Sequence, residues 1–498
     1  MVRIQPLPSL LTTRPLLTTR RWCEAVFSYR TSGPICSAKT NSATSWRARA
    51  SPARSTESLL HVPACTLHTM VGPVAPVSHG PKLAAGRWGV TDDAISIGGV
   101  NLADRCTYSE RMPYEAFRKL RERAPVAWHP YKDGPGFLAL TGYDEVLAVS
   151  RDSATWSSET DAVYFDVPGP DDLADMRGVM MLTMDPPRHT ALRALVNKGF
   201  TPRQVAKLNE RIADMARDVV DRVIEQGECD FVNDVAGALP SYVIAELLGI
   251  PLEDGYRLYE LTEITNTGLV GDPRATEAAM EMFAYAAELA ARKRAQPGDD
   301  IATSLVHAEV DGQHLTDMEF NLFFILLINA GGDTTRNLVA GGMGVLIEHP
   351  EEWTKLEADP SLLPTAVEEM LRYVSPVIVF VRTATKDTEL RGVRVKKGDR
   401  AAMFYPSANR DETQFADPDR FDVSRTPNPH VAFGGGGTHF CLGANLARVE
   451  AAAIVSEVLS RMKNLELAGP MERMRSMLIN GIHSMPVRFT PARPVGAR

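Results

Sequence analysis

The feature that most constrains the fold is one long apolar segment, Leu315–His349. Thr316 and Glu319 form a capping box at its start. The helical pattern then runs for about 33 residues, roughly 50 Å at 1.5 Å per residue. From Phe320 to Ala330 the segment is apolar nearly all round, which is typical of a helix buried on every side. The sequence therefore predicts a buried helical spine around which the rest of the chain packs.

One group of residues inside this helix, Ala330 to Thr335, breaks the rules for a buried helix. Each of its two glycines costs about 1 kcal/mol in a helix interior. A buried acid such as Asp333 costs more unless it is used. Local violations of this kind point to a functional site. A glycine kink that serves packing alone is the alternative, but it leaves the acid unexplained.

A second unusual stretch is His430–Glu450, where four glycines lead to a single thiol, Cys441. Glycine permits a positive φ and a close approach of the backbone to a neighbouring group. A thiol at the start of a helix is favoured as a thiolate by the helix dipole and the free N–H groups. A thiolate with a hydrogen-bonded sulfur suits an axial ligand of haem iron. A free cysteine in a glycine-rich loop is the alternative interpretation.

This stretch resembles the haem-binding loop of the cytochrome P-450 family, Phe-x-x-Gly-x-His/Arg-x-Cys-x-Gly. The matching residues are Phe433, Gly437, His439, Cys441 and Gly443. The phenylalanine lies one residue farther from the cysteine than in the commonest spacing, which is similar to a subgroup of bacterial sterol and branched-lipid hydroxylases. The resemblance implies a mainly α fold with a small β portion. It also implies haem b, buried between the long helix and the cysteine loop, with Cys441 as the ligand of its iron.

The same resemblance makes residues 330–335 the family's oxygen-activation motif. Asp333 and Thr334 would be the catalytic residues that relay protons to dioxygen, and Ala330 and Gly331 would lie against the haem. The implied activity is that of a monooxygenase, which inserts one atom of dioxygen into a C–H bond of a hydrophobic substrate. No flavin motif is visible in the sequence, so electrons are expected from a separate ferredoxin and its ferredoxin reductase.

Two segments are assigned to the haem propionates. His189 and Arg193 are four residues apart, and so share one face of the helix expected after Pro186 and Pro187. The resemblance makes this a propionate-binding helix, and arginine binds carboxylates bidentately. By the same resemblance Arg382, in a strand-like run, reaches a propionate. A solvated charged helix is the alternative for the first pair taken alone.

Two further groups follow from the family pattern. Glu369 and Arg372 match its Glu-x-x-Arg pair, which is buried and joined by an arginine from a later loop, a role that Arg420 fits. We interpret these three residues as structural, holding the loop that presents the cysteine. Core packing is nearly as good an explanation as substrate contact for the apolar residues expected to line the pocket, which are Val179, Met180, Leu327, Val377, Val379, Phe380, Ile479 and Ile482.

The β portion is expected in short pieces. Residues 126–129 and 136–141 read as strands that could pair in a small sheet, and residues 392–399 and 401–405 suggest a hairpin. No stretch approaches the ~20 consecutive apolar residues of a membrane span.

Charge is unevenly distributed along the 498 residues, whose net charge is −8. Residues 1–69 carry nine basic and two acidic residues, and the remainder carries a large excess of acid, which argues against a nucleic-acid partner. We interpret residues 1–69 as a basic extension, either a transit peptide or sequence upstream of a true start at Met70. Residues 70–498 form the haem domain. We favour the second interpretation, because the rest of the chain resembles soluble bacterial enzymes, and it predicts a cytoplasmic enzyme. The first predicts a mitochondrial one.

The substrate class rests on the resemblance alone. The fragments AGGDTTRN and PNPHVAFGGGGTHFCLGANLAR look like those of bacterial steroid side-chain and methyl-branched lipid terminal hydroxylases. We therefore expect terminal hydroxylation of a steroid side chain, such as that of cholesterol or cholestenone, or of a branched lipid. A terpene (linalool-like) hydroxylase is one alternative. A haem-thiolate protein that does not activate dioxygen, such as a peroxygenase or haem sensor, is another. A small acidic ferredoxin is expected to dock on a basic face, to which we assign Arg188, Arg203, Lys207 and Arg448.

Overall fold

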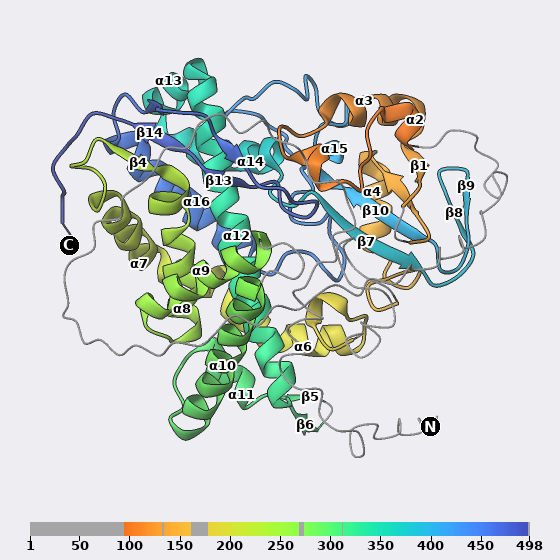
Figure 1. The fold of residues 1–498 in the computed structure, drawn as a ribbon, viewed down its shortest axis with the longest axis horizontal. Helices are drawn as coiled ribbons and strands as arrows, with labels where there is room; N and C mark the ends of the chain where they lie inside the picture. The colour runs from red at the N-terminus through yellow and green to blue at the C-terminus, as the bar shows by residue number, and fades with distance from the viewer. Residues whose placement is uncertain (1–93, 132–133, 161–177, 268–272, 311, 497–498) are drawn as a thin grey trace, which may run out of the picture. The chain divides into compact units, whose positions relative to one another are not determined.

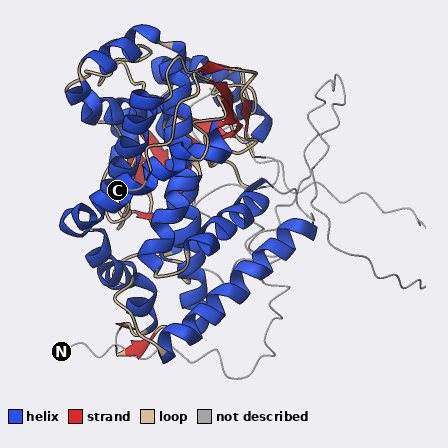
Figure 2. Cartoon of the chain, turned by 90° about the vertical axis from the view of Figure 1, so that its left-hand side faces the viewer, coloured by secondary structure: helices blue, strands red, loops and turns tan. Residues whose placement is uncertain are grey.

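The computed structural model describes residues 94–131, 134–160, 178–267, 273–310 and 312–496 (Figure 1). The predicted basic extension, residues 1–69, lies outside the described residues. Helices make up most of the described chain, and the strands occur in a few small groups (Figure 2). The mainly α fold with a small β portion is therefore confirmed. The helices are α2 (Ala94–Gly98), α3 (Tyr114–Arg123), α4 (Tyr143–Arg151), α6 (Arg188–Asn197), α7 (Pro202–Asp221), α8 (Ala238–Leu248), α9 (Leu252–Thr267), α10 (Pro273–Ala295), α11 (Ile301–Val306), α12 (Asp317–Glu348), α13 (Pro350–Ala358), α14 (Leu363–Val374), α15 (Tyr405–Ala408) and α16 (Ala444–Arg461).

The long helix α12 has 32 residues and begins at the predicted capping box. The Thr316 side chain accepts from the Glu319 backbone N–H at 3.2 Å, and the Glu319 carboxylate accepts from the Thr316 N–H at 2.8 Å. Helices α8, α9, α10, α14 and α16 pack against α12, which crosses the middle of Figure 1. The largest apolar core surrounds this helix, as expected for a segment that is apolar nearly all round.

The main sheet has five strands in the order β1-β2-β10-β7-β3. The predicted pairing of β1 with β2 is confirmed, and it is antiparallel. The predicted hairpin between residues 392–399 and 401–405 is wrong, because β9 pairs with β8 while β10 joins β7 antiparallel and β2 parallel. The strands are β1 (Val126–His129), β2 (Phe137–Leu140), β3 (Trp156–Ser157), β4 (Glu228–Asp230), β5 (Glu309–Val310), β6 (Gln313–His314), β7 (Val379–Ala384), β8 (Thr388–Leu390), β9 (Val393–Val395), β10 (Arg400–Phe404), β11 (Glu466–Leu467), β12 (Glu472–Arg473), β13 (Ile482–Ser484) and β14 (Pro486–Arg488).

One described segment, Phe231–Leu248, is long and apolar enough to cross a membrane. It combines a π-helical turn (Phe231–Ala236) with α8, and 78% of it is buried inside the protein, as in the core helix of a globular domain. Its apolar composition agrees with its packing against both α12 and α9.

Candidate functional site

A cavity of about 250 Å³ lies where α12 faces the cysteine loop. Its walls come from segments far apart in sequence: α6, α8, α12, β7 and the loop that leads into α16. Most of the sequence-predicted site residues meet here, namely His189, Arg193, Leu327, Ala330, Gly331, Thr334, Val377, Phe380, Arg382, Phe433, His439, Cys441 and Gly443.

The glycine run fixes the path of the cysteine loop. Gly434, Gly435, Gly436 and Gly437 have φ angles of +97°, +64°, +101° and +78°, a succession that residues with a Cβ rarely adopt. The reason for the last glycine differs from the prediction. A Cβ on Gly437 would lie 2.1 Å from the Ser150 carbonyl oxygen, so this glycine accommodates neighbouring backbone and does not line the cavity.

Cys441 lies three residues before the first residue of α16. Its side chain is accessible from the cavity, which is itself enclosed by surrounding protein. Its backbone N–H donates to the Phe433 carbonyl at 3.0 Å. Burial raises the pKa of the thiol, and the Gly443 backbone N–H, Arg193 and Arg448 act in the opposite direction. The sulfur therefore has a hydrogen-bond donor and two nearby cations, which are features that stabilise a thiolate once a cation binds it.

Four basic side chains gather on one wall of the cavity: His189, Arg193, Arg382 and His439. The two imidazole rings lie 4.2 Å apart between centroids. Burial lowers the pKa of His189 to about 4 and that of His439 to about 3, with the neighbouring arginines adding to the effect. Burial also lowers the pKa of both arginines.

This basic wall fits a ligand that carries carboxylates. Among the described residues, no carboxylate forms an ion pair with Arg193 or Arg382, which donate hydrogen bonds to the carbonyls of Phe440 and Val381. The Nδ1 atom of His189 is buried without a hydrogen-bond partner in the same part of the chain. Buried cations are normally paired, so this wall suits an anion that the described residues do not supply. The propionates of a haem supply two negative charges next to a thiol, and the residues present fit that group.

Of the two predicted catalytic residues of α12, only Thr334 lines the cavity. Its hydroxyl donates to the Ala330 carbonyl at 2.8 Å. Asp333 is buried outside the cavity lining, with Oδ1 3.3 Å from Nη2 of Arg336. Arg336 is fully buried, and its Nη1 lies 2.5 Å from Glu263 and 2.8 Å from the Tyr259 hydroxyl. The acid therefore belongs to a buried charged cluster that joins α12 to α9.

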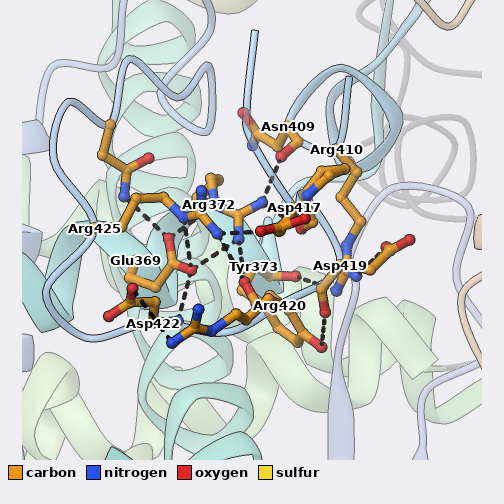
Figure 3. Close-up of polar contacts among 12 residues, drawn as sticks. Glu369, Arg372, Tyr373, Asn409, Arg410, Asp417, Asp419, Arg420, Asp422 and Arg425 are labelled. Atoms are coloured by element: carbon orange, nitrogen blue, oxygen red, sulfur yellow. Dashed lines mark hydrogen bonds and ion pairs between the residues drawn. The ribbon is translucent and has the colours of Figure 1, made fainter. Parts of the chain in front are cut away.

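A second buried charged cluster holds the irregular segment before the cysteine loop, residues 409–428, which we call the meander (Figure 3). Arg372 Nε and Nη2 each donate to Glu369 at 2.8 Å, and neither side chain is exposed. The arginine that joins this pair is Arg425, whose Nε donates to Glu369 at 3.1 Å. The prediction of Arg420 is wrong, because its side chain is 63% exposed and only its backbone carbonyl accepts from Arg372. Arg425 also donates to the carbonyls of residues 416, 417 and 420, so its place in this cluster depends on how the chain turns.

Five predicted pocket residues do not line the cavity: Val179, Met180, Val379, Ile479 and Ile482. Strand alternation explains Val379, because β7 directs Phe380 to the cavity and its neighbour to a core on the other face. Ile482 is 4% exposed and packs in the core beside α12, where its N–H donates to Asn337. Val179 and Met180 pack against the same core, and residues 181 and 182 reach the cavity in their place.

The sequence reasoning missed several lining residues. Pro240 and Ile244 come from α8, and a Cβ added at Gly331 would lie 3.4 Å from Ile244. The apolar composition of α8 was a signal of burial, although it gave no indication of which face meets the cavity. Glu450 of α16 also lines the cavity, and burial raises its pKa to about 8. An acid inside an apolar helix was the available signal for this residue.

Comparisons with known proteins agree with this geometry. Residues 272–481 match the model of the cytochrome P450 family. The chain is 40% identical over 406 residues to a steroid C26-monooxygenase of Rhodococcus jostii, covering 79% of this chain and 85% of that protein. It is 40% identical over 392 residues to a methyl-branched lipid omega-hydroxylase of Mycobacterium tuberculosis, covering 75% and 90%. A Mycobacterium marinum cytochrome P450 solved with pseudoionone superposes with a TM-score of 0.73 at 38% identity, covering 77% and 97%.

Proposed function

Because this chain belongs to the cytochrome P450 family and is a monooxygenase of that family, we propose that it hydroxylates the terminal carbon of a steroid side chain or of a methyl-branched lipid. The observation that carries the proposal is the cavity itself, in which one thiol and a basic wall face an otherwise largely apolar surface. Similarity to the two relatives named for steroid and branched-lipid oxidation supports this substrate class.

The cofactor in this proposal is haem b, with Cys441 as the ligand of its iron. His189, Arg193 and Arg382 would bind its propionates, and the N–H of Gly443 would donate to the thiolate. When bound, haem supplies the dioxygen chemistry of the family. The balanced reaction takes substrate, dioxygen, two electrons and two protons to an alcohol and water.

The chain's own residues bind the substrate and move the protons. Leu327, Val377 and Phe380 offer apolar contacts and exclude water from the cavity. The Thr334 hydroxyl, held on the Ala330 carbonyl, is placed to pass a proton into the cavity. Asp333 would resupply that proton, and its side chain must first turn away from Arg336. Leu327, Val377 and Phe380 offer no charge to a polar substrate head, so shape would select the substrate at this wall.

The electron donor in this proposal is a small ferredoxin, reduced by its own reductase. Arg203 and Lys207 are exposed on α7 and suit an acidic partner. Arg188 is paired with Glu319, and Arg448 with Glu368, so these two are poorer docking residues than the sequence indicated. We propose that the protein acts in the cytoplasm, which its similarity to bacterial relatives supports.

The test begins with the absorbance spectrum of the purified, haem-loaded protein, ferrous and bound to carbon monoxide. A thiolate-type band that disappears in Cys441→Ala is the expected result. Titration with cholest-4-en-3-one, a methyl-branched fatty acid and linalool should then give a low-to-high-spin shift with the true substrate class. Product analysis should find a terminal alcohol. A histidine-type spectrum, or absence of haem uptake, would overturn the proposal.

A terpenoid is the second candidate substrate, because the M. marinum relative was solved with pseudoionone. A spin shift with linalool alone would select it over the steroid or branched lipid.

A further inference from the structure

Behind the cysteine loop lies a cluster of three ionisable side chains that the proposed reaction does not use. Glu368 belongs to α14, Arg448 to α16, and His430 to the start of the loop. Arg448 Nε and Nη2 donate to the two carboxylate oxygens of Glu368 at 2.5 and 2.9 Å, which is a bidentate pair. Its Nη1 donates to the Ala444 carbonyl at 3.1 Å. The guanidinium is therefore fixed by both neighbours.

His430 completes the cluster through two hydrogen bonds. Its Nδ1 atom accepts from the Ala432 backbone N–H at 3.3 Å, and its Nε2 atom lies 3.0 Å from Glu368. Burial would raise the pKa of Glu368, but the hydrogen bonds from Arg448 and His430 lower it to about 2. Arg448 thus brings a positive charge to the cluster, and Glu368 brings a negative one.

The positive charge of this cluster lies next to the predicted iron ligand. The Cζ atom of Arg448 lies 4.5 Å from the centroid of the Phe433 ring, in a cation–π arrangement. Phe433 lines the cavity, and its carbonyl accepts the N–H of Cys441. The charge of Arg448 also acts directly on the thiol. Glu368 is the carboxylate that offsets this charge.

We propose that Glu368 is a positioning residue that holds Arg448 against Phe433 and, by offsetting the charge of Arg448, sets the reduction potential of the iron that Cys441 would bind. This inference rests on the proposed function. An added electron is favoured by a nearby positive charge and opposed by a nearby negative one. Charge and hydrogen bonding around the ligand are known to tune the potential of haem iron.

The test measures the midpoint potential of the ferric–ferrous couple in three variants. Glu368→Gln leaves Arg448 without its counter-charge, so the equilibrium constant for reduction should rise about threefold or more, ~28 mV at 59 mV per tenfold. Arg448→Gln leaves the carboxylate alone, so the constant should fall by a similar factor. The double variant should return close to the wild-type potential.

The opposite signs separate electrostatics from simple loosening of the loop. If the cluster only holds the loop in place, both single variants should move the potential in the same direction. That result, or no shift in either variant, would overturn the inference. Glu368→Asp keeps the charge and should keep the potential within the error of the measurement.

A matched control removes one negative charge far from the cysteine loop. Glu357 of α13 pairs with Lys463, which lies two residues beyond the end of α16, and α16 is roughly 27 Å long at helical rise. Glu357→Gln should leave the potential unchanged. The carbon monoxide spectrum of each protein shows whether the proposed function or only this inference has failed. Absence of the thiolate band in the wild type would contradict the proposed function. An intact band, with shifts of the midpoint potential opposite to those expected, would contradict only this inference.

Discussion

At the scale of single residues, two glycines near the cysteine serve different purposes. Gly437 has a φ of +78° and lies against the Ser150 carbonyl, so the fold itself excludes a side chain there. Gly443 has an ordinary φ of −84°, and none of the described residues lies within 4 Å of the position of its missing Cβ. The described part of the protein therefore leaves room for a side chain at Gly443.

These glycines give the first prediction. Gly437→Ala should cost the haem-free protein about 2–4 kcal/mol of unfolding free energy, because the new Cβ meets backbone in a strained conformation. Gly443→Ala should change it by less than about 0.5 kcal/mol and yet weaken haem uptake. Urea unfolding of the haem-free variants and haem titration would check both. Equal stability losses in the two variants would contradict this distinction.

Thr334 gives the second prediction, since its hydroxyl is the polar group that α12 offers near the proposed proton path. Thr334→Ala should lower the fraction of consumed dioxygen that appears as product about tenfold, with substrate binding unchanged. Thr334→Ser keeps the hydroxyl and should retain most of the coupling. The ratio of product to dioxygen measures this effect. A protein in which the alanine variant stays fully coupled would instead resemble the peroxide-driven alternative.

At the scale of elements, buried charges join helices that are distant in sequence. Arg336 of α12 contacts Asp333 on its own helix and Glu263 on α9. Arg372 of α14 contacts Glu369 together with the meander. In both cases one arginine satisfies several acceptors away from water, so its removal leaves acids or carbonyls buried without their donor.

The third prediction concerns the link between α9 and α12. Arg336→Met should destabilise the protein by about 3–5 kcal/mol, because it removes a fully buried cation that contacts both Asp333 and Glu263. Adding Glu263→Gln should recover part of that loss. Arg257→Met is the control on α9, where an exposed pair is worth less than about 1 kcal/mol. Denaturant unfolding measures all three, and a loss in Arg336→Met no larger than in the control would refute the link.

The fourth prediction separates the two candidate arginines of the meander. Arg425→Ala should cost about 2–4 kcal/mol and reduce haem retention, since Arg425 contacts buried Glu369 and three carbonyls. Arg420→Ala should stay within about 0.5 kcal/mol, because its side chain is largely exposed. Thermal melts and the haem-to-protein absorbance ratio provide the measurements. The reverse order of effects would restore the sequence-based assignment.

At the scale of the whole molecule, the basic wall of the cavity connects haem binding to acid stability. His189 has a folded-state pKa of about 4, below the roughly 6.5 of an unfolded histidine. Between these values the unfolded chain binds more protons, so the His189 contribution to stability is lost as pH falls from about 6.5 to about 4. A carboxylate beside the ring raises the folded pKa and shrinks this loss.

The fifth prediction follows from this loss of stability as the pH falls. The haem-free protein should lose more stability between pH 7 and pH 5 than the haem-loaded protein. Glu450 acts in the opposite direction, because its folded-state pKa of about 8 lies above that of an unfolded glutamate. The difference between wild type and His189→Asn, both haem-free, isolates the histidine and should show a flatter pH profile in the variant. Identical profiles would contradict the assignment.

The sequence alone determined the family, the central helix and the identity of the main chemical groups. Cys441 with its glycine run, and residues 330–335 within an apolar helix, are local patterns, and local chemistry can be read from a linear chain. The capping box at Thr316 and the pairing of β1 with β2 were predictable for the same reason, because each depends on residues close in sequence.

The tertiary structure decided which distant residues meet. Arg425 and Arg420 look equivalent in the sequence, and only the path of the meander places one of them on Glu369. The pocket predictions at Val379 and Ile482 failed because strand direction and packing, and not hydrophobicity, determine which apolar side chain faces a cavity. Likewise, the contact of Arg336 with Glu263 and the pairing of Arg448 with Glu368 depend on how helices pack. These contacts are long-range, and no local pattern encodes them.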